Sequence, residues 1–201
     1  SNWELLITDD CSKDDTINII KKFQEIDNRI QLFSTGKNSG AAAARNISLQ
    51  NATGKYIAFL DSDDTWISNK LETQIKFMKK NNIAFSFSNY SVMKEDGTPT
   101  GNIIHAPKVI GYHGYLRNTI IGCLTVIIDK EKTGSFMMPN IKSSHDMALW
   151  LLIMKRGFKA YGLQKTLANY RLVSTSKKKK KWKAAKDVWK VYREIEHINP
   201  I

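Results

Sequence analysis

The sequence predicts an α/β domain in which helices flank a mostly parallel central sheet. Short apolar runs alternate with amphipathic segments along the chain, which is typical of βαβ units. The 201 residues are 42% hydrophobic, which is enough to bury one sizeable core. The pattern therefore favours one α/β unit over several separate modules.

Strands and helices are expected to alternate through residues 1–98. Each expected strand is an apolar run or alternates apolar and polar residues, and these strands are 3–8, 29–34, 55–60 and 83–93. The expected helices between them are 11–27, 41–52 and a segment marked by Leu71, Ile75 and Met78. Gly54 follows the second helix and is expected to close it as a C-cap.

The first of these helices carries two local signals. Ser12 and Asp15 form a capping-box pattern at its start. Ile17, Ile20 and Phe23 recur at the spacing of one apolar helix face.

The second half of the domain is expected over residues 99–173. A turn signal at 95–98 leads into an irregular stretch, rich in Pro and Gly, that runs to Tyr115. Strands are expected at 124–129 and 167–173, and the apolar segment before Gly157 is expected to be a buried helix closed by that glycine. A basic tail, 174–201, follows this half.

Cysteine usage and hydropathy predict a cytoplasmic location. Cys11 and Cys123 lie far apart without a CxxC spacing, so neither a disulfide framework nor a zinc site is expected. The longest apolar run, 120–128, is too short to cross a bilayer, and no secretory leader pattern is visible.

Acidic residues follow two of the expected strands. In a parallel α/β sheet, ligands bind beyond the carboxyl ends of the strands. Asp61 and Asp63, followed by Asp64, would project to one side roughly 7 Å apart if the chain stays extended. That spacing suits a shared hydrated Mg²⁺ or Mn²⁺, although solvated turn residues are the alternative. Asp9 and Asp10 could accept hydrogen bonds from a base or a ribose hydroxyl, or could cap the following helix.

The segment 38–46, "NSGAAAARN", suggests an anion site. It begins with Asn38, places Gly40 at a helix start and carries Arg45 one turn later. A helix N-terminus and an arginine would suit a diphosphate. An ordinary packed Ala-rich helix is the alternative.

Five segments, in this order and at these distances, resemble glycosyltransferase family 2, the inverting sugar transferases of GT-A fold: "ELLITDDCSKDDT", "NSGAAAARN", "GKYIAFLDSDD", "HDMALWLLIMKRG" and "YRLVSTS". The resemblance covers nearly all of residues 3–176 and is closest to bacterial enzymes that assemble teichuronic acid or capsular polysaccharide. It implies a Rossmann-like nucleotide half over 1–98, an acceptor half over 99–173 with a smaller sheet, and a C-terminal helix.

The resemblance also implies roles for individual residues. Asp63 would be the direct ligand of Mn²⁺ or Mg²⁺ and Asp61 would lie beside it, nearer the ribose or the donor sugar. Asp146 would be the catalytic base, whereas without the resemblance it would be assigned as an N-cap. The residues expected at the nucleotide are Asp9, Asp10, Asn38, Gly40, Arg45, Asp61 and Arg171.

The implied activity is metal-dependent transfer of a sugar, with inversion, from a nucleotide diphosphate sugar. UDP is the expected nucleotide, and the acceptor is a hydroxyl of a growing, lipid-linked cell-surface polysaccharide. The base removes the acceptor proton while the cation neutralises the departing nucleoside diphosphate.

Two departures from the family pattern leave alternatives open. His145 stands where the family usually has an acid, and the family's first strand and Pro-x-Tyr-Asn turn are expected to be missing. A non-catalytic, membrane-attached subunit that binds a nucleotide or a sugar is therefore one alternative. A second follows from the D-x-D-x-T pattern, in which Asp61 would be the nucleophile of a haloacid-dehalogenase-type phosphatase.

The tail concentrates the charge of the chain. Of the net charge of +12, residues 177–193 contribute +8, from eight lysines and one arginine against one aspartate. Trp182, Ala185, Trp189 and Tyr192 fall at the spacing of one helix face. Peripheral contact with an anionic membrane, at its inner face, is one interpretation. A helix packed on the domain is the other, and nucleic-acid binding is not expected because no recognition module accompanies the charge.

Overall fold

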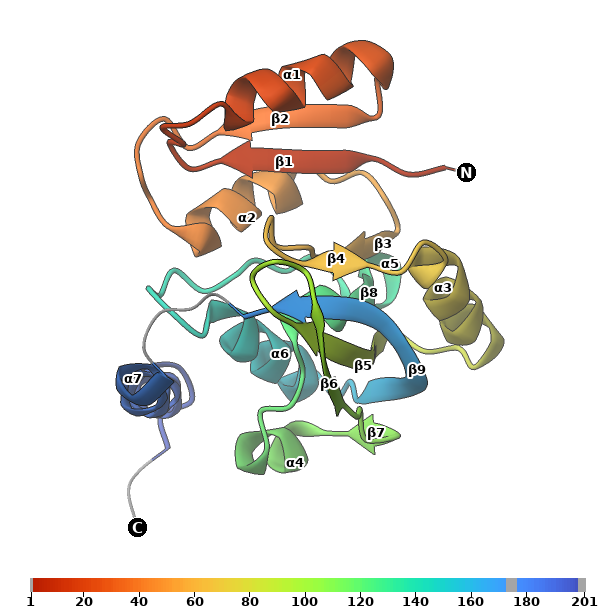
Figure 1. The fold of residues 1–201 in the computed structure, drawn as a ribbon. Coiled ribbons are helices and arrows are strands. Elements are labelled where there is room, and N and C mark those ends of the chain that lie inside the picture. The colour runs from red at the N-terminus through yellow and green to blue at the C-terminus, as the bar shows by residue number, and fades with distance from the viewer. Residues whose placement is uncertain (1, 173–176, 199–201) are drawn as a thin grey trace.

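A computed structural model describes residues 2–172 and 177–198 of the chain, and helices flank its sheets as expected for an α/β protein (Figure 1). The strands are β1 (Leu5–Asp9), β2 (Ile30–Ser34), β3 (Tyr56–Ala58), β4 (Thr65–Trp66), β5 (Phe85–Met93), β6 (Pro99–Ile104), β7 (Val109–Ile110), β8 (Ile127–Asp129) and β9 (Ala160–Arg171). The helices are α1 (Thr16–Ile26), α2 (Ala41–Asn51), α3 (Lys70–Lys80), α4 (Tyr112–Arg117), α5 (Lys130–Thr133), α6 (His145–Lys155) and α7 (Lys177–Lys190). A 3₁₀ turn (Cys123–Thr125) precedes β8, and a π turn (Val191–Ile195) continues α7.

The strands form a mixed arrangement. β1 and β2 make a parallel pair, and the main sheet has the order β3-β8-β5-β9-β4. Among the described residues only β1–β2 and β5–β9 pair in parallel, so the prediction of a mostly parallel sheet is wrong. The short connection between β5 and β6 is one reason, because a tight hairpin can only join antiparallel strands.

The stretch expected to be irregular contains β6, β7 and α4. β6 pairs with β5 beyond the residues that β8 occupies, and β7 pairs with the start of β9. These strands therefore extend the main sheet, in the part of the chain where a separate smaller sheet was expected.

The centre of the domain is the apolar helix α6. Its residues Met147 to Leu151 are almost completely buried, as predicted. The Trp150 ring packs against Phe59 and Phe85, with centroid distances of 5.7 and 5.4 Å. Gly157 follows with φ +93°, and its N–H donates to Met154, which confirms the predicted helix stop.

Three local predictions in the first part of the chain were wrong or incomplete. α1 begins after Asp15, and the Ser12 N–H is used by the Asp9 carboxylate, so no capping box forms. Phe23 is 55% exposed, while Ile20 of the same helix is buried. α2 ends at Asn51 with Ala52 as its C-cap, and the Gly54 N–H instead donates to the Glu4 carboxylate at 2.8 Å.

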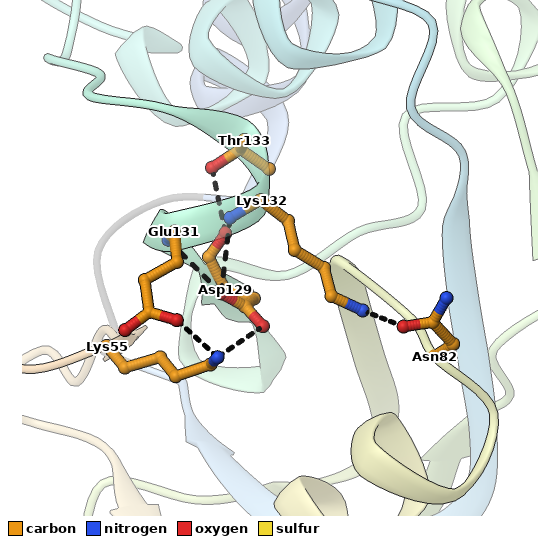
Figure 2. Close-up of polar contacts among 6 residues, drawn as sticks. All are labelled: Lys55, Asn82, Asp129, Glu131, Lys132 and Thr133. Atoms are coloured by element: carbon orange, nitrogen blue, oxygen red, sulfur yellow. Dashed lines mark hydrogen bonds and ion pairs between the residues drawn. The ribbon is translucent and has the colours of Figure 1, made fainter.

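A polar cluster fixes β8 to the start of β3 (Figure 2). The Asp129 carboxylate accepts hydrogen bonds from the backbone N–H groups of Glu131 and Lys132, which caps α5. The Lys55 ammonium lies 3.8 Å from that carboxylate and also pairs with Glu131, and Lys132 bonds to Asn82 (Figure 2). This cluster lies at the opposite end of β3 from the acidic residues 61–64, so it sets the strand register away from the candidate site.

The tail forms the helix expected for it, packed at its C-terminal end. Val188, Val191, Tyr192 and Ile195 pack against the main core. Trp182, Ala185 and Trp189 are exposed. The prediction that Tyr192 shares a helix face with Trp182 and Trp189 was therefore wrong. Tyr192 lies one turn after Val188 and packs inward with it.

No helix in the described ranges is both long and apolar enough to cross a membrane. The end of the strand expected over 167–173 and the start of the tail at 174–176 lie outside the described residues.

Candidate active site

The acids of residues 61–64 form a tight turn. The Asp64 N–H donates to the Asp61 carbonyl at 3.0 Å, so the extended geometry considered for these residues does not occur. The Asp61 side chain is 40% exposed, and Asp63 is exposed and its carboxylate accepts no hydrogen bond from the residues that the structure describes. Asp64 points the other way and is buried.

Arg171, at the end of β9, holds this turn in place. Its backbone N–H donates to the Asp64 carboxylate at 2.8 Å, and its guanidinium donates to the carbonyls of Asp63 at 2.6 Å and Glu95 at 2.7 Å. Burial raises the pKa of Asp64 to about 6, with Asp63 and Asp61 adding to the shift and Arg171 opposing it. Asp64 had no predicted role of its own, although its position as a third acid directly after the Asp61-Ser62-Asp63 pattern was a signal for one.

Arg45, on α2, connects the acidic turn to α6. Its guanidinium pairs with the Asp61 carboxylate and contacts Nε2 of His145. A guanidinium has only donors, so Nε2 must accept and the imidazole is neutral with its proton on Nδ1. Burial and then the charge of Arg45 lower the pKa of His145, which agrees with a neutral ring.

Asp146 lies in the first turn of α6, beside this cluster. The N-cap position belongs to Ser144, which has φ +56°, so Asp146 does not take the alternative role of a cap. The Asp146 side chain is partly exposed and accepts no hydrogen bond within the described residues. Burial and then the charge of Asp146 raise the pKa of the buried Tyr115 well above its usual range.

Asp9 is buried at the end of β1. Its carboxylate accepts hydrogen bonds from the N–H groups of Cys11, at 3.0 Å, and Ser12, at 3.2 Å. These bonds shape the turn that leads to α1, where Cys11 has φ +68°.

Asp10 binds the loop before α2. Its carboxylate accepts from the N–H groups of Ser39 at 2.7 Å and Gly40 at 2.8 Å, and from the Thr35 hydroxyl at 2.8 Å. The Ser39 N–H, then Thr35, lower the pKa of Asp10. Gly40 has φ +87°, a conformation that favours glycine, and Asn38 donates to the Asp10 carbonyl at 3.4 Å. The structure therefore brings three of the predicted nucleotide residues together at one loop.

An open cavity of about 300 Å³ adjoins this loop. Neutral polar and small side chains line it: Thr35, Ser39, Ala43, Asn46, Ile47, Gln50 and Asn140. Asn46 is fixed by two hydrogen bonds with the backbone of Met138, at 2.9 and 2.7 Å. The sequence analysis did not identify this cavity, because Asn140 comes from a distant segment.

Within the described residues, no three His, Cys, Asp or Glu side chains are grouped so that they alone could hold a metal ion. The exposed carboxylates of Asp61 and Asp63 are hard oxygen donors of the kind that Mg²⁺ and Mn²⁺ prefer. The donor set fits a cation that takes its other ligands from water and from phosphate oxygens.

Comparisons with known proteins agree on the family of this chain. The model of "Glycosyl transferase family 2" matches residues 1–138, which include the acidic turn and Arg45. The chain is 53% identical over 198 residues to "Putative teichuronic acid biosynthesis glycosyltransferase TuaG" of Bacillus subtilis, covering 98% of this chain and 79% of that protein. It is 42% identical over 202 residues to the Escherichia coli "UDP-Glc:alpha-D-GlcNAc-diphosphoundecaprenol beta-1,3-glucosyltransferase WfgD", covering 100% of this chain and 78% of that protein.

A solved structure supports the fold. The mannosyltransferase PcManGT of Pyrobaculum calidifontis, in complex with GDP-Man and Mn²⁺, superposes with a TM-score of 0.69 at 14% identity. The match covers 98% of this chain and 56% of that longer one. Because the family model spans the D-x-D-x-T pattern, the phosphatase alternative has no support. On the family match and the identity to these two relatives, the chain belongs to glycosyl transferase family 2.

Proposed function

We propose that this glycosyltransferase transfers a sugar, with inversion and with the help of a divalent cation, from a UDP-sugar to a hydroxyl of a growing, lipid-linked cell-surface polysaccharide. The names of its relatives support each part of that substrate pair. TuaG is named for teichuronic acid, and WfgD is named for UDP-Glc and a diphosphoundecaprenol-linked acceptor. The expected site of action is the cytoplasmic side of the membrane, where the enzyme would be peripheral.

The observation that carries the proposal is the convergence on Arg45. This one side chain joins the acidic turn, through Asp61, to the start of α6, through His145, and Asp146 is the next residue. The groups proposed to bind the donor and to activate the acceptor thus lie around one cationic side chain. In the proposed reaction, Arg45 would bind the donor diphosphate, with Arg171 holding the turn beside it.

The nucleotide would bind at the carboxyl end of β1. Asp10 keeps Gly40 and the loop before α2 in position. Among the described residues, its Oδ2 accepts one hydrogen bond, from the Gly40 N–H, so this oxygen can accept a second one from a base N–H. Asn38 lies at the same loop and would contact the nucleotide from its exposed position. Asp9, being buried, would contribute by shaping the turn on which Asp10 sits.

Asp63 and Asp61 are the proposed metal ligands. Asp63 is free to coordinate, whereas Asp61 must exchange its bond to Arg45 for the cation or share both. Mg²⁺ or Mn²⁺ binds in this way, through one or two carboxylates plus substrate phosphates, and the Mn²⁺ in the PcManGT complex supports the assignment. When bound, the cation would supply charge neutralisation of the diphosphate leaving group.

Asp146 is the proposed general base. Its carboxylate accepts no hydrogen bond in the described structure, so it is available to accept the proton of the attacking hydroxyl. The neighbouring His145 is neutral, so it does not form an ion pair with the Asp146 carboxylate. It instead accepts from Arg45, which keeps the guanidinium directed at the acidic turn.

Calorimetric titration of UDP into the protein, with and without Mn²⁺ and with GDP for comparison, tests the donor half of the proposal. We expect UDP binding that depends on Mn²⁺ and is lost in Asp63→Ala. Glu25→Ala, on the exposed side of α1, removes an acid far from the turn and should bind normally. Manganese-independent binding that survives Asp63→Ala would contradict the metal assignment, and preference for GDP would contradict the nucleotide.

A further inference from the structure

The tail helix α7 is fixed to the domain at one end. The Glu196 side chain is completely buried, pairs with Lys155 at 2.8 Å and accepts a hydrogen bond from Tyr112. The Tyr192 hydroxyl donates to the Leu116 carbonyl, and Val191 is 1% exposed. These contacts orient the helix relative to α4 and α6, so the directions of its outward side chains are determined.

The outward side of α7 carries a tryptophan face, which we define as Trp182, Ala185 and Trp189. These residues are three and four positions apart, so they lie on one side of the helix. Trp182 is 77% exposed and Trp189 is 53% exposed. Aromatic side chains normally bury most of their surface, so two exposed indoles in line indicate a contact surface rather than a solvated one.

The charge around the tryptophan face is strongly positive. α7 contains eight lysines and one aspartate, a net charge of +7 over 14 residues. Lys186 and Lys190 are exposed, and Lys186 lies about one turn from each tryptophan while Lys190 follows Trp189 directly. Indoles prefer the boundary between lipid headgroups and acyl chains, and lysines are attracted to anionic headgroups. Water would hydrate the lysines but leave the indoles exposed, and an apolar protein groove would bury the indoles but leave the lysines unpaired.

The helix also lies where a membrane contact would be useful. Figure 1 shows α7 toward the edge of the molecule to which β1, β2 and β9 point. This is the edge that carries Asp10 and Arg171, at the ends of β1 and β9. In this view α7 therefore lies on the same side of the molecule as the ends of β1 and β9.

We propose that α7 is a docking surface for an anionic lipid bilayer, with the helix lying in the headgroup plane and Trp182 and Trp189 inserted. This proposal specifies the membrane contact by residue and orientation. It does not depend on the sugar donor or on catalysis, so it can fail or succeed independently of the proposed function.

Vesicle binding tests the proposal. Sedimentation of the protein with vesicles of phosphatidylcholine, with and without phosphatidylglycerol, should give binding only to the anionic vesicles. Trp182→Ala with Trp189→Ala should weaken that binding about tenfold, since the inserted aromatic area is lost. Lys186→Gln with Lys190→Gln should weaken it about 30-fold, because each lysine near an anionic surface contributes roughly fivefold to the affinity.

Matched control variants separate the role of the tryptophan face from a general effect of removing apolar surface or positive charge. Phe23→Ala with Ile26→Ala removes exposed apolar surface on α1, and Lys79→Gln with Lys80→Gln removes exposed charge on α3. Both control variants should bind vesicles normally. Vesicle binding that is absent, or that the tryptophan variant leaves unchanged, would overturn the proposal. Binding to a single-stranded oligonucleotide without vesicle binding would overturn it in favour of nucleic acid.

Discussion

The first layer of the molecule, formed by β1, α1, β2 and α2, is held together differently from the main sheet. Among its described apolar side chains, Ile20 and Ala42 are buried, while Ile19, Phe23 and Ile26 are exposed by 48, 55 and 82%. Ala42, with Leu49 of the same helix, packs against the main core, and the loop before α2 is held by the hydrogen bonds that Asp10 accepts from Ser39 and Gly40. The geometry of that loop therefore depends on a few hydrogen bonds, each of which a ligand or a substitution can alter.

The main sheet and α6 have a dense apolar core. Phe85, Ile128 and Trp150 are completely buried, and they belong to one continuous cluster. The difference shows that the residue proposed to bind the donor and the residue proposed to activate the acceptor lie on parts of the molecule that are packed to different extents. Asp146 is on a rigid helix in the core, whereas Asp10 is on a layer with little core of its own.

Asp146→Asn should have the largest effect on function and little effect on folding. Removing the proposed base should reduce sugar transfer by about 10²–10⁴-fold, because the isosteric amide cannot accept the proton. UDP binding and thermal stability should remain, since the side chain makes no hydrogen bond in the described structure. Single-turnover transfer, calorimetry and thermal denaturation measure these three quantities. Transfer at the normal rate would show that the base lies elsewhere.

Trp150→Ala and Phe23→Ala test the contrast in packing directly. Trp150→Ala should lower the free energy of unfolding by about 3–5 kcal/mol, because it empties a fully buried site. Phe23→Ala should change it by only about 0.5 kcal/mol, because that ring is mostly exposed. Urea denaturation gives both values. If both substitutions lowered the free energy of unfolding equally, the Phe23 ring would be packed more tightly than its exposure in the structure indicates.

The buried Lys70 side chain should make the stability of the protein depend on pH. Its ammonium is buried and bonds to Gln74 at 2.6 Å and to the Thr125 carbonyl at 3.1 Å. Burial lowers the pKa of Lys70 to about 7, from 10.5. Between these values the folded state binds fewer protons than the unfolded state, so stability should rise with pH from about 7 toward 10.

The size of that effect should be about 1–2 kcal/mol between pH 7 and 9. Unfolding free energies of the protein and of Lys70→Met, measured at both pH values, isolate the contribution. The variant should lose this part of the pH dependence. An identical rise in both proteins would assign it to other groups.

Asp10→Ala should have the most local effect on the structure. Loss of its bonds to Ser39 and Gly40 should speed hydrogen exchange at those two amides by about tenfold, corresponding to roughly 1.5 kcal/mol. Exchange within α6 should not change. If α6 amides also exchanged faster, the two regions would be one cooperative unit and the comparison above would fail.

Most helices and strands could be predicted from periodicity, and α6 with its Gly157 stop is the clearest case. Strand direction could not be predicted, because β8 and β9 take their partners from distant parts of the chain. The exposure of Phe23 was also invisible, since helical spacing identifies an apolar face but not whether anything covers it.

The candidate site was predictable in composition but not in its contacts. The position of the acids after β1 and β3, at strand ends where α/β proteins bind ligands, could be predicted from the sequence alone. The turn at 61–64, the burial of Asp64 and the clamp by Arg171 depend on where β9 ends, more than 100 residues later. No local pattern encodes such a contact.

The shared guanidinium of Arg45 has a consequence for the order of events on the enzyme. Asp61 and His145 draw on two nitrogens of one planar group, so a ligand that displaces either contact changes the energy of the other. Occupancy of the acidic turn and the setting of the first turn of α6 are thermodynamically linked. Because such coupling is reciprocal, a donor at the turn and an acceptor at α6 would each change the affinity for the other, whichever binds first.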